Sequence, residues 1–245
     1  MSASVRALPR PAATTVLTLL VILAALALSF SPPASAGGPP SGDAGAVTKT
    51  GDTTYKTVEG RWVSAGCEPS GPVAIKRDFV LADKTWSLEA PIYADNDCTV
   101  PLFTVLVGGD YKLLGPSKQA EGARKGRFFI GYRRVIPMQQ SIADAMTAGE
   151  CGNTTSVVGV ATDILQTGCA PLGQESQSAC PVEYDLLMRT GDELFFGERP
   201  ADQRGLCSPD RQATTLTPPL VLTQAVGAAS PHRLHADRRA ALDGR

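Results

Sequence analysis

The sequence contains few of the residues on which common catalytic sites depend. Its two histidines, His232 and His235, both lie near the end of the chain, so Ser-His-Asp and Cys-His catalysis are excluded from the central part. There is no C-x-x-C pair and no glycine-rich phosphate loop, which argues against a zinc site and a nucleotide site. No catalytic residue, metal or cofactor is expected, and a binding role is favoured over an enzymatic one.

Long apolar stretches are also scarce. The longest is VLTLLVILAALALSF, residues 16–30, which follows Arg10 and precedes an A-x-A arrangement at Ala34 and Ala36. This order predicts a signal peptide over residues 1–36, and hence export to the extracellular space or the periplasm. The run is short for a bilayer span, so no transmembrane anchor is expected after cleavage.

Neither sign of charge predominates. The chain has 23 basic and 24 acidic residues, for a net charge of −1. Such a balance indicates no binding surface for nucleic acid. The polar segments at residues 37–56 and 224–245 are predicted to be a flexible lead-in and a disordered tail, with one domain at residues 57–223 between them.

The six cysteines all follow the predicted signal peptide. An even number in an exported chain indicates disulfides, and six cysteines allow fifteen pairings. The simplest pairs neighbours in sequence order. The cysteines are Cys67, Cys98, Cys151, Cys169, Cys180 and Cys207.

Most of the central part alternates apolar and polar residues with a period of two, which is typical of β-strands. Strands are predicted over residues 73–81, 85–93, 102–107, 110–114, 127–136, 156–165, 182–189, 193–198 and 214–222. Gly108-Gly109 is expected to break or bulge the third, Gly191-Asp192 to form a tight hairpin, and the proline-containing last strand to lie at an edge. A helix is predicted from Pro137 to Gly149. The fold class is mainly β: an antiparallel curved sheet or half-open barrel with one short helix, stapled by disulfides.

An ordered series of short motifs runs along the domain. It includes GRWVSAGCE, IKRDFVLADKTWSLEAPIYADNDCT, YRRVIPM, ECG, TGCAPLG, EYDLL, FFGERP, SPDRQATT and PPLV. From about Gly60 to Leu222, this series resembles the domain of the adenomatosis polyposis coli down-regulated (APCDD-type) Wnt-antagonist family. Here it occurs in single copy and without the C-terminal transmembrane helix of the animal proteins.

The resemblance implies an extracellular, non-enzymatic domain with an apolar pocket for a fatty-acyl group, which binds Wnt proteins and negatively regulates Wnt signalling. It also implies the pairs Cys67–Cys98 and Cys151–Cys169. It is silent on Cys180 and Cys207, which are then left to each other.

We therefore expect a binding module whose partner is a fatty-acyl or lipid ligand, or a lipidated protein. The expected pocket residues are Trp86, Leu88, Phe103, Val105, Phe128 and Ile130, although each fits a packed core equally well. One alternative is a ligand-free extracellular interaction or envelope domain, with a filled barrel. Another is a hydrolase built on two facing carboxylates, one with a raised pKa. Its candidates are Glu89, Asp110, Glu183, Asp185 and Glu193.

Overall fold

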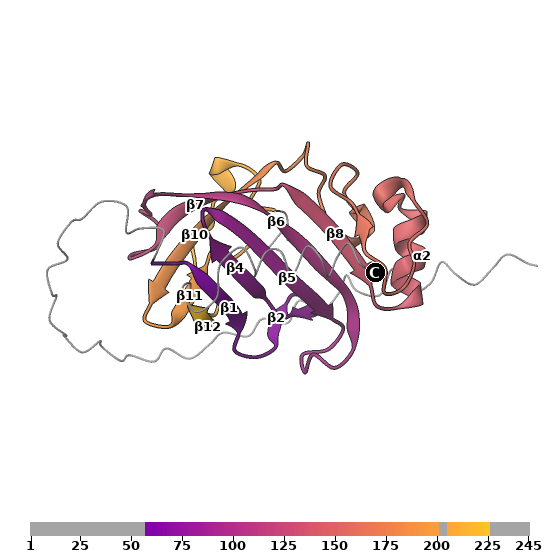
Figure 1. Ribbon diagram of the computed structural model, residues 1–245, viewed down its shortest axis with the longest axis horizontal. Helices are drawn as coiled ribbons and strands as arrows, with labels where there is room; N and C mark the ends of the chain where they lie inside the picture. Colours follow the sequence, from indigo (N-terminus) through magenta and orange to yellow (C-terminus); the bar gives the residue numbers. More distant parts are fainter. Residues whose placement is uncertain (1–56, 201–204, 226–245) are drawn as a thin grey trace, which may run out of the picture. The chain divides into compact units, whose positions relative to one another are not determined.

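The computed structural model describes residues 57–200 and 205–225, so the predicted signal peptide, the lead-in and most of the tail lie outside the described residues. The fold is an antiparallel β-barrel with one α-helix (Figure 1), which confirms the predicted fold class. Eight strands form a closed ring: β1 (Gly60–Ser64), β4 (Asp78–Ala82), β5 (Thr85–Tyr93), β6 (Pro101–Pro116), β7 (Arg124–Phe129), β10 (Val182–Thr190), β11 (Glu193–Phe196) and β12 (Leu220–Ala225).

The ring strands follow one another in chain order, and β12 returns to pair with β1. This is an up-and-down barrel, in which closure leaves no free edge. The chain leaves the ring twice to form further strands. The first excursion, residues 65–77, carries β2 (Glu68–Ser70) and β3 (Val73–Ile75). The second, residues 130–181, carries β8 (Tyr132–Pro137), α2 (Gln140–Ala148), β9 (Thr162–Asp163) and the 3-10 turns η1 (Cys151–Asn153) and η2 (Ala170–Leu172). A third 3-10 turn, η3 (Pro209–Arg211), precedes β12.

Strands β5 and β6 belong to two sheets at once. One part of each lies in the ring, and the rest forms a side sheet in the order β2-β3-β5-β6-β8-β9. Figure 1 shows β8 and α2 at the opposite end of the barrel from the β10–β11 hairpin. The side sheet therefore extends away from the end of the barrel at which that hairpin turns.

Gly108 and Gly109 lie where β6 changes its partner from β8 to β7. The prediction that they break or bulge the strand is wrong, because the pairing with β5 runs through both without a shift. A Cβ on Gly109 would lie 2.2 Å from the carbonyl oxygen of Phe129, and one on Gly108 would lie 2.5 Å from that of Trp86. The glycines are needed because neighbouring backbones approach too closely for any side chain.

The single strand predicted over residues 127–136 is divided into β7 and β8. Both pair with β6, but their registers differ by one residue, as at a bulge. The inward face therefore changes beyond the division. Arg133 and Val135 are buried there, and the predicted inward residues Tyr132 and Ile136 are only half-buried.

Other boundaries also need correction. The helix begins at Gln140 rather than Pro137, because Pro137 is still paired in β8. Its last residue is Ala148, and Gly149 caps it as predicted. The strand predicted over residues 73–81 is divided into β3 and β4, and the one over 156–165 shrinks to β9. Strand β12 is not an edge, since it lies between β11 and β1. It extends to Ala225, past the predicted domain end at residue 223.

Five aromatic side chains pack across the middle of the barrel. The ring of Phe79 stacks on Phe196 at 4.2 Å, and the ring of Phe128 lies 5.2 Å from Trp86 and 5.8 Å from Tyr111. All five are at most 7% exposed. An eight-stranded barrel is narrow enough for side chains to fill, and these rings occupy its middle.

The three disulfides pair the cysteines in sequence order, as predicted. Cys67–Cys98 joins the first excursion to the β5–β6 connection. Cys151–Cys169 lies within the second excursion, and Cys180–Cys207 joins its end to the connection between β11 and β12. The bonds therefore brace both excursions and leave the ring itself to hydrogen bonding and packing.

Candidate functional site

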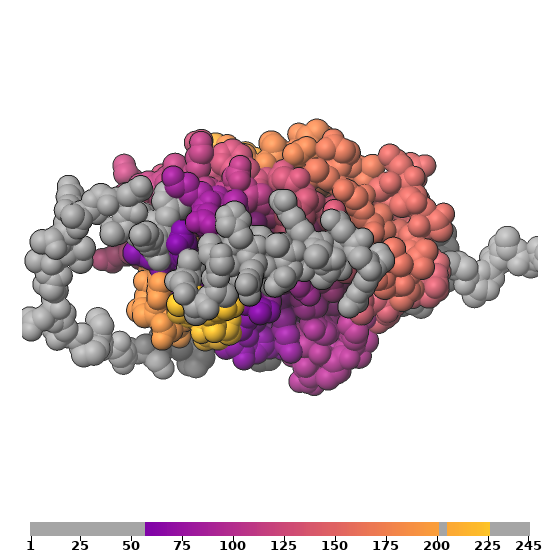
Figure 2. Space-filling model, in the orientation of Figure 1, coloured from indigo at the N-terminus to yellow at the C-terminus, as the bar shows by residue number. Residues whose placement is uncertain are grey.

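A pocket of about 500 Å³ lies at the end of the barrel where the β10–β11 hairpin turns. Gly122, in the β6–β7 turn, and Gly191, in the β10–β11 turn, form part of its rim. In Figure 2 this orange hairpin and the salmon second excursion occupy opposite ends of the molecule. We call this cavity the mouth pocket.

The mouth pocket combines an apolar wall with two arginines. Its apolar residues are Val58, Leu113, Leu187 and Met188, and its charged residues are Arg124 and Arg189. Leu187 and Arg124 are brought together because they pair directly across β10 and β7. No acidic residue is among the described lining residues, so the lining carries net positive charge.

The two arginines differ in their partners. Arg189 donates from Nη1 to the carbonyl oxygen of Thr57 at 2.6 Å and from Nε to that of Gly191 at 2.7 Å. Its guanidinium also lies over the ring of Trp62, at 5.1 Å. The Nε of Arg124, in contrast, is buried and has no hydrogen-bond partner among the described residues. Arg189 therefore holds the barrel end together, whereas the Nε donor of Arg124 is unsatisfied.

The six residues predicted to line a pocket all belong to the apolar core. Five are buried, Leu88 is half-buried against them, and Trp86 also donates from Nε1 to the carbonyl oxygen of Phe129 at 3.1 Å. None of the six lines the mouth pocket. The structure brings them together as packing partners. The sequence analysis missed the residues that line the mouth pocket. Leucine and methionine in a strand are expected to pack in a core, so their pattern did not predict a pocket.

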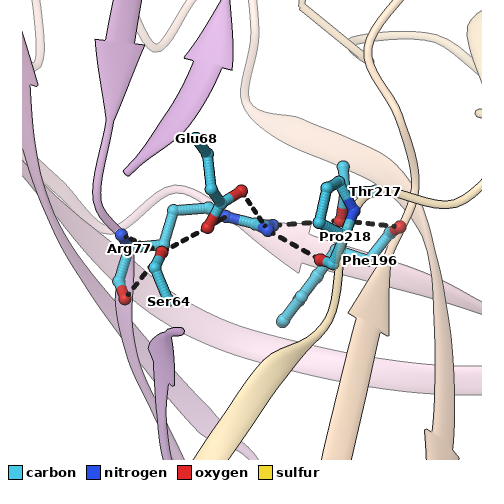
Figure 3. A network of polar contacts seen from close by, with 6 residues as sticks. All are labelled: Ser64, Glu68, Arg77, Phe196, Thr217 and Pro218. Carbon is cyan, nitrogen blue, oxygen red and sulfur yellow. Dashed lines mark hydrogen bonds and ion pairs between the residues drawn. The ribbon is translucent and has the colours of Figure 1, made fainter. Parts of the chain in front are cut away.

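A second polar feature is the buried pair of Arg77 and Glu68, shown in Figure 3. Their side chains are 9% and 13% exposed, and the Nη2–Oε2 distance is 2.6 Å. Arg77 also donates to the hydroxyl of Thr217 at 3.1 Å and the carbonyl oxygen of Pro218 at 3.0 Å. The backbone N–H of Arg77 donates to the hydroxyl of Ser64 at 2.7 Å. This network ties the first excursion to the segment before β12.

A third polar feature surrounds Asp185 on β10. Its Oδ1 accepts hydrogen bonds from the backbone N–H groups of Leu186, at 2.7 Å, and Gly197, at 2.8 Å. Burial is the main cause that raises the pKa of Asp185 to about 7. Nearby, the Nη2 of Arg199 lies 2.9 Å from Glu183, whose negative charge raises the pKa of Arg199. The carboxyl of Asp185 thus joins β10 to β11, and it does not line the mouth pocket.

Within residues 57–200 and 205–225, no group of three or more potential metal ligands comes together. No helix in the same part of the chain is long and apolar enough to cross a membrane.

The closed barrel, its disulfides and the mouth pocket are together consistent with a binding module. A comparison with family models is more specific. Residues 46–164 match the family described as adenomatosis polyposis coli down-regulated 1, and the match occurs once. Residues 46–164 are therefore similar to the domain of this family. The match spans β1 to β9, and the last three ring strands lie beyond it although they complete the same barrel.

Proposed function

We propose that this chain is an exported, non-enzymatic module that binds the acyl chain of a lipid in the mouth pocket. The observation that carries the proposal is the continuity of this pocket with the apolar core. Val58 and Leu187 belong to the core cluster, and Leu113 packs against it. An acyl chain in the pocket would therefore contact the core directly.

The size of the pocket supports this ligand class. Its volume of about 500 Å³ lies within the range of roughly 300–1,000 Å³ that is usual for small-molecule sites. Burying roughly ten methylene groups would contribute about 8 kcal/mol before the cost of ordering the ligand. That is enough for useful affinity without a covalent link.

The disulfides support export, because such bonds persist in oxidising compartments. The apolar run at residues 16–30 supports a signal peptide as the route. The match to this family supports a role as a Wnt-binding negative regulator of Wnt signalling, in which the domain engages the lipid of a lipidated partner protein.

A ligand-free interaction domain is the second candidate function. It is favoured by the aromatic packing in the middle of the barrel and by a group of exposed apolar side chains beside α2. Met138 is 42% exposed, Val157 55% and Val160 48%, and the nearby N–H of Gly159 donates to the carbonyl oxygen of Pro137. In this function the patch, rather than the mouth pocket, would contact a partner protein.

Titration of the oxidised protein with palmitoleate, followed by native mass spectrometry, tests the proposal. We expect one acyl chain per protein. Leu113→Asp should abolish binding because it places a charge in the apolar wall, and Lys112→Asp, at an exposed position on the same strand, should not. Both variants must show the thermal unfolding of a folded protein.

No uptake of palmitoleate by the wild-type protein would refute the acyl-binding function and favour the ligand-free one. Equal binding by wild type and a folded Leu113→Asp variant would refute the mouth pocket as the site.

A further inference from the structure

We propose that Arg124 binds a carboxylate, so that the preferred ligand of the mouth pocket is a free long-chain fatty acid. This inference rests on the proposed acyl-binding function and goes further, because it specifies the polar end of the ligand. An acyl group attached to a protein or glycerol through an ester has no such charge.

The first argument is the spare donor of Arg124. Its Nε is buried, and the guanidinium makes no hydrogen bond or ion pair with the described residues. Buried donors in folded proteins nearly always have a partner, because an unpaired one loses its hydration without compensation. Arg124 lines the pocket, so a ligand acceptor that contacts the terminal nitrogens of its guanidinium would be stabilising.

The second argument is the contrast with Arg189. That side chain is held by two backbone carbonyl oxygens and by Trp62, and the carboxylate of Asp192 lies 3.9 Å from it. A ligand anion would have to displace these contacts to reach it. Arg124 needs no such displacement, which makes it the cation of the pocket that a ligand can use.

The third argument is the distribution of charge and apolar surface. The described lining holds two arginines and no carboxylate, so an anion meets no repulsion from it. Leu113, Leu187 and Met188 supply the apolar surface beside the guanidinium. A ligand that satisfies both has a hydrocarbon chain and one terminal anionic group.

The fourth argument is geometric. A guanidinium is planar, and its two terminal nitrogens match the two oxygens of a carboxylate. Because Nε of Arg124 is buried, these terminal nitrogens are the part of the side chain that a ligand in the pocket would contact. A hydroxyl or a methyl ester offers only a neutral acceptor there, so it gains less.

The experiment compares palmitoleate with palmitoleyl alcohol and methyl palmitoleate at pH 8, where the acid is ionised. The oxidised wild-type protein is titrated with each by native mass spectrometry or calorimetry. We expect the acid to bind about tenfold to hundredfold more tightly than the alcohol, as hydrogen bonds to a charged group would provide. Arg124→Met should remove this preference and leave the affinity for the alcohol unchanged.

Arg127→Met is the matched control, because Arg127 lies on the same strand but is exposed and contacts Tyr184 rather than the pocket. It should leave the preference for the acid intact. Arg124→Lys keeps the charge without the planar edge, so it should retain only part of the preference. It also serves if Arg124→Met does not fold.

Two failures are distinguishable. If the wild-type protein binds the acid and the alcohol equally, or if a folded Arg124→Met variant keeps its preference for the acid, the assignment to Arg124 is overturned and acyl binding stands. If the wild-type protein binds none of the three lipids, the proposed function itself fails, and this inference fails with it.

Discussion

Replacement of Asp185 by asparagine should stabilise the protein at neutral and alkaline pH. Burial raises the pKa of this carboxyl to about 7, whereas an aspartate in an unfolded chain has a pKa near 3.9. Between these values the folded state keeps the proton and the unfolded state has lost it. The free energy of unfolding therefore falls as the pH rises from about 4 to about 7, and it then levels off.

The size of the effect follows from the shift. Three pKa units at about 1.4 kcal/mol each give roughly 4 kcal/mol as an upper limit. The side chain of Asp185 keeps some exposure to solvent, and solvent that reaches the carboxyl lowers the energy below this limit. The Oδ1 of an asparagine can still accept from Leu186 and Gly197, so Asp185→Asn should remove the ionisation penalty and keep both hydrogen bonds.

Urea unfolding at several pH values from 4.5 to 8.5 measures the effect, with the disulfides intact. The fluorescence of Trp62 and Trp86, which are 0% and 4% exposed, reports the transition. The difference between Asp185→Asn and wild type should grow from near zero at the acidic end to a few kcal/mol at pH 8. Asp192→Asn, at a side chain 85% exposed, is the control. A difference that does not change with pH would refute the reasoning.

Three further changes test the packing, and urea unfolding measures each of them. Gly109→Ala should destabilise the folded protein by about 1–3 kcal/mol or more, because the added Cβ would overlap a backbone carbonyl. Gly115→Ala is the control on the same strand and should be close to neutral, because nothing lies within 4 Å of its added Cβ. Equal effects would contradict the close approach. Arg77→Met should cost about 3–5 kcal/mol because it leaves a buried carboxylate unpaired, and a cost below about 1 kcal/mol would mean that water replaces the arginine. Serine at both Cys180 and Cys207 should cost about 3.5 kcal/mol for a sequence separation of 27 residues, and no loss would indicate a strained bond.

The features that the sequence predicts correctly are local ones. The strand at residues 85–93 and the hairpin turn at Gly191-Asp192 both form because alternation and turn residues act over a few neighbours. The exchange of partners at Gly108-Gly109 has no such signal, since it depends on which other strands approach. The change of face beyond Ile130 is invisible for the same reason.

The mouth pocket could not be predicted because its residues come from segments far apart in the sequence. Val58, Leu113, Arg124 and Leu187 meet only when the ring closes.

The buried ion pair is different, because the sequence marks one of its residues. Arg77 is the one charged residue among the alternate apolar positions of the strand predicted over residues 73–81. Its partner Thr217, however, is 140 positions away, and nothing in the pattern connects the two.

The second excursion leaves β7 after Phe129 and returns to β10 at Val182, and these two residues are paired directly opposite each other. For the ring, residues 130–181 are therefore equivalent to the loop of a hairpin. The entropic cost of closing a loop rises only slowly with its length. Insertions or deletions within residues 130–181 should therefore cost the barrel little stability. The Cys151–Cys169 bond gives this segment its own brace. The pairing of β7 with β10 would therefore persist if this segment were longer or shorter.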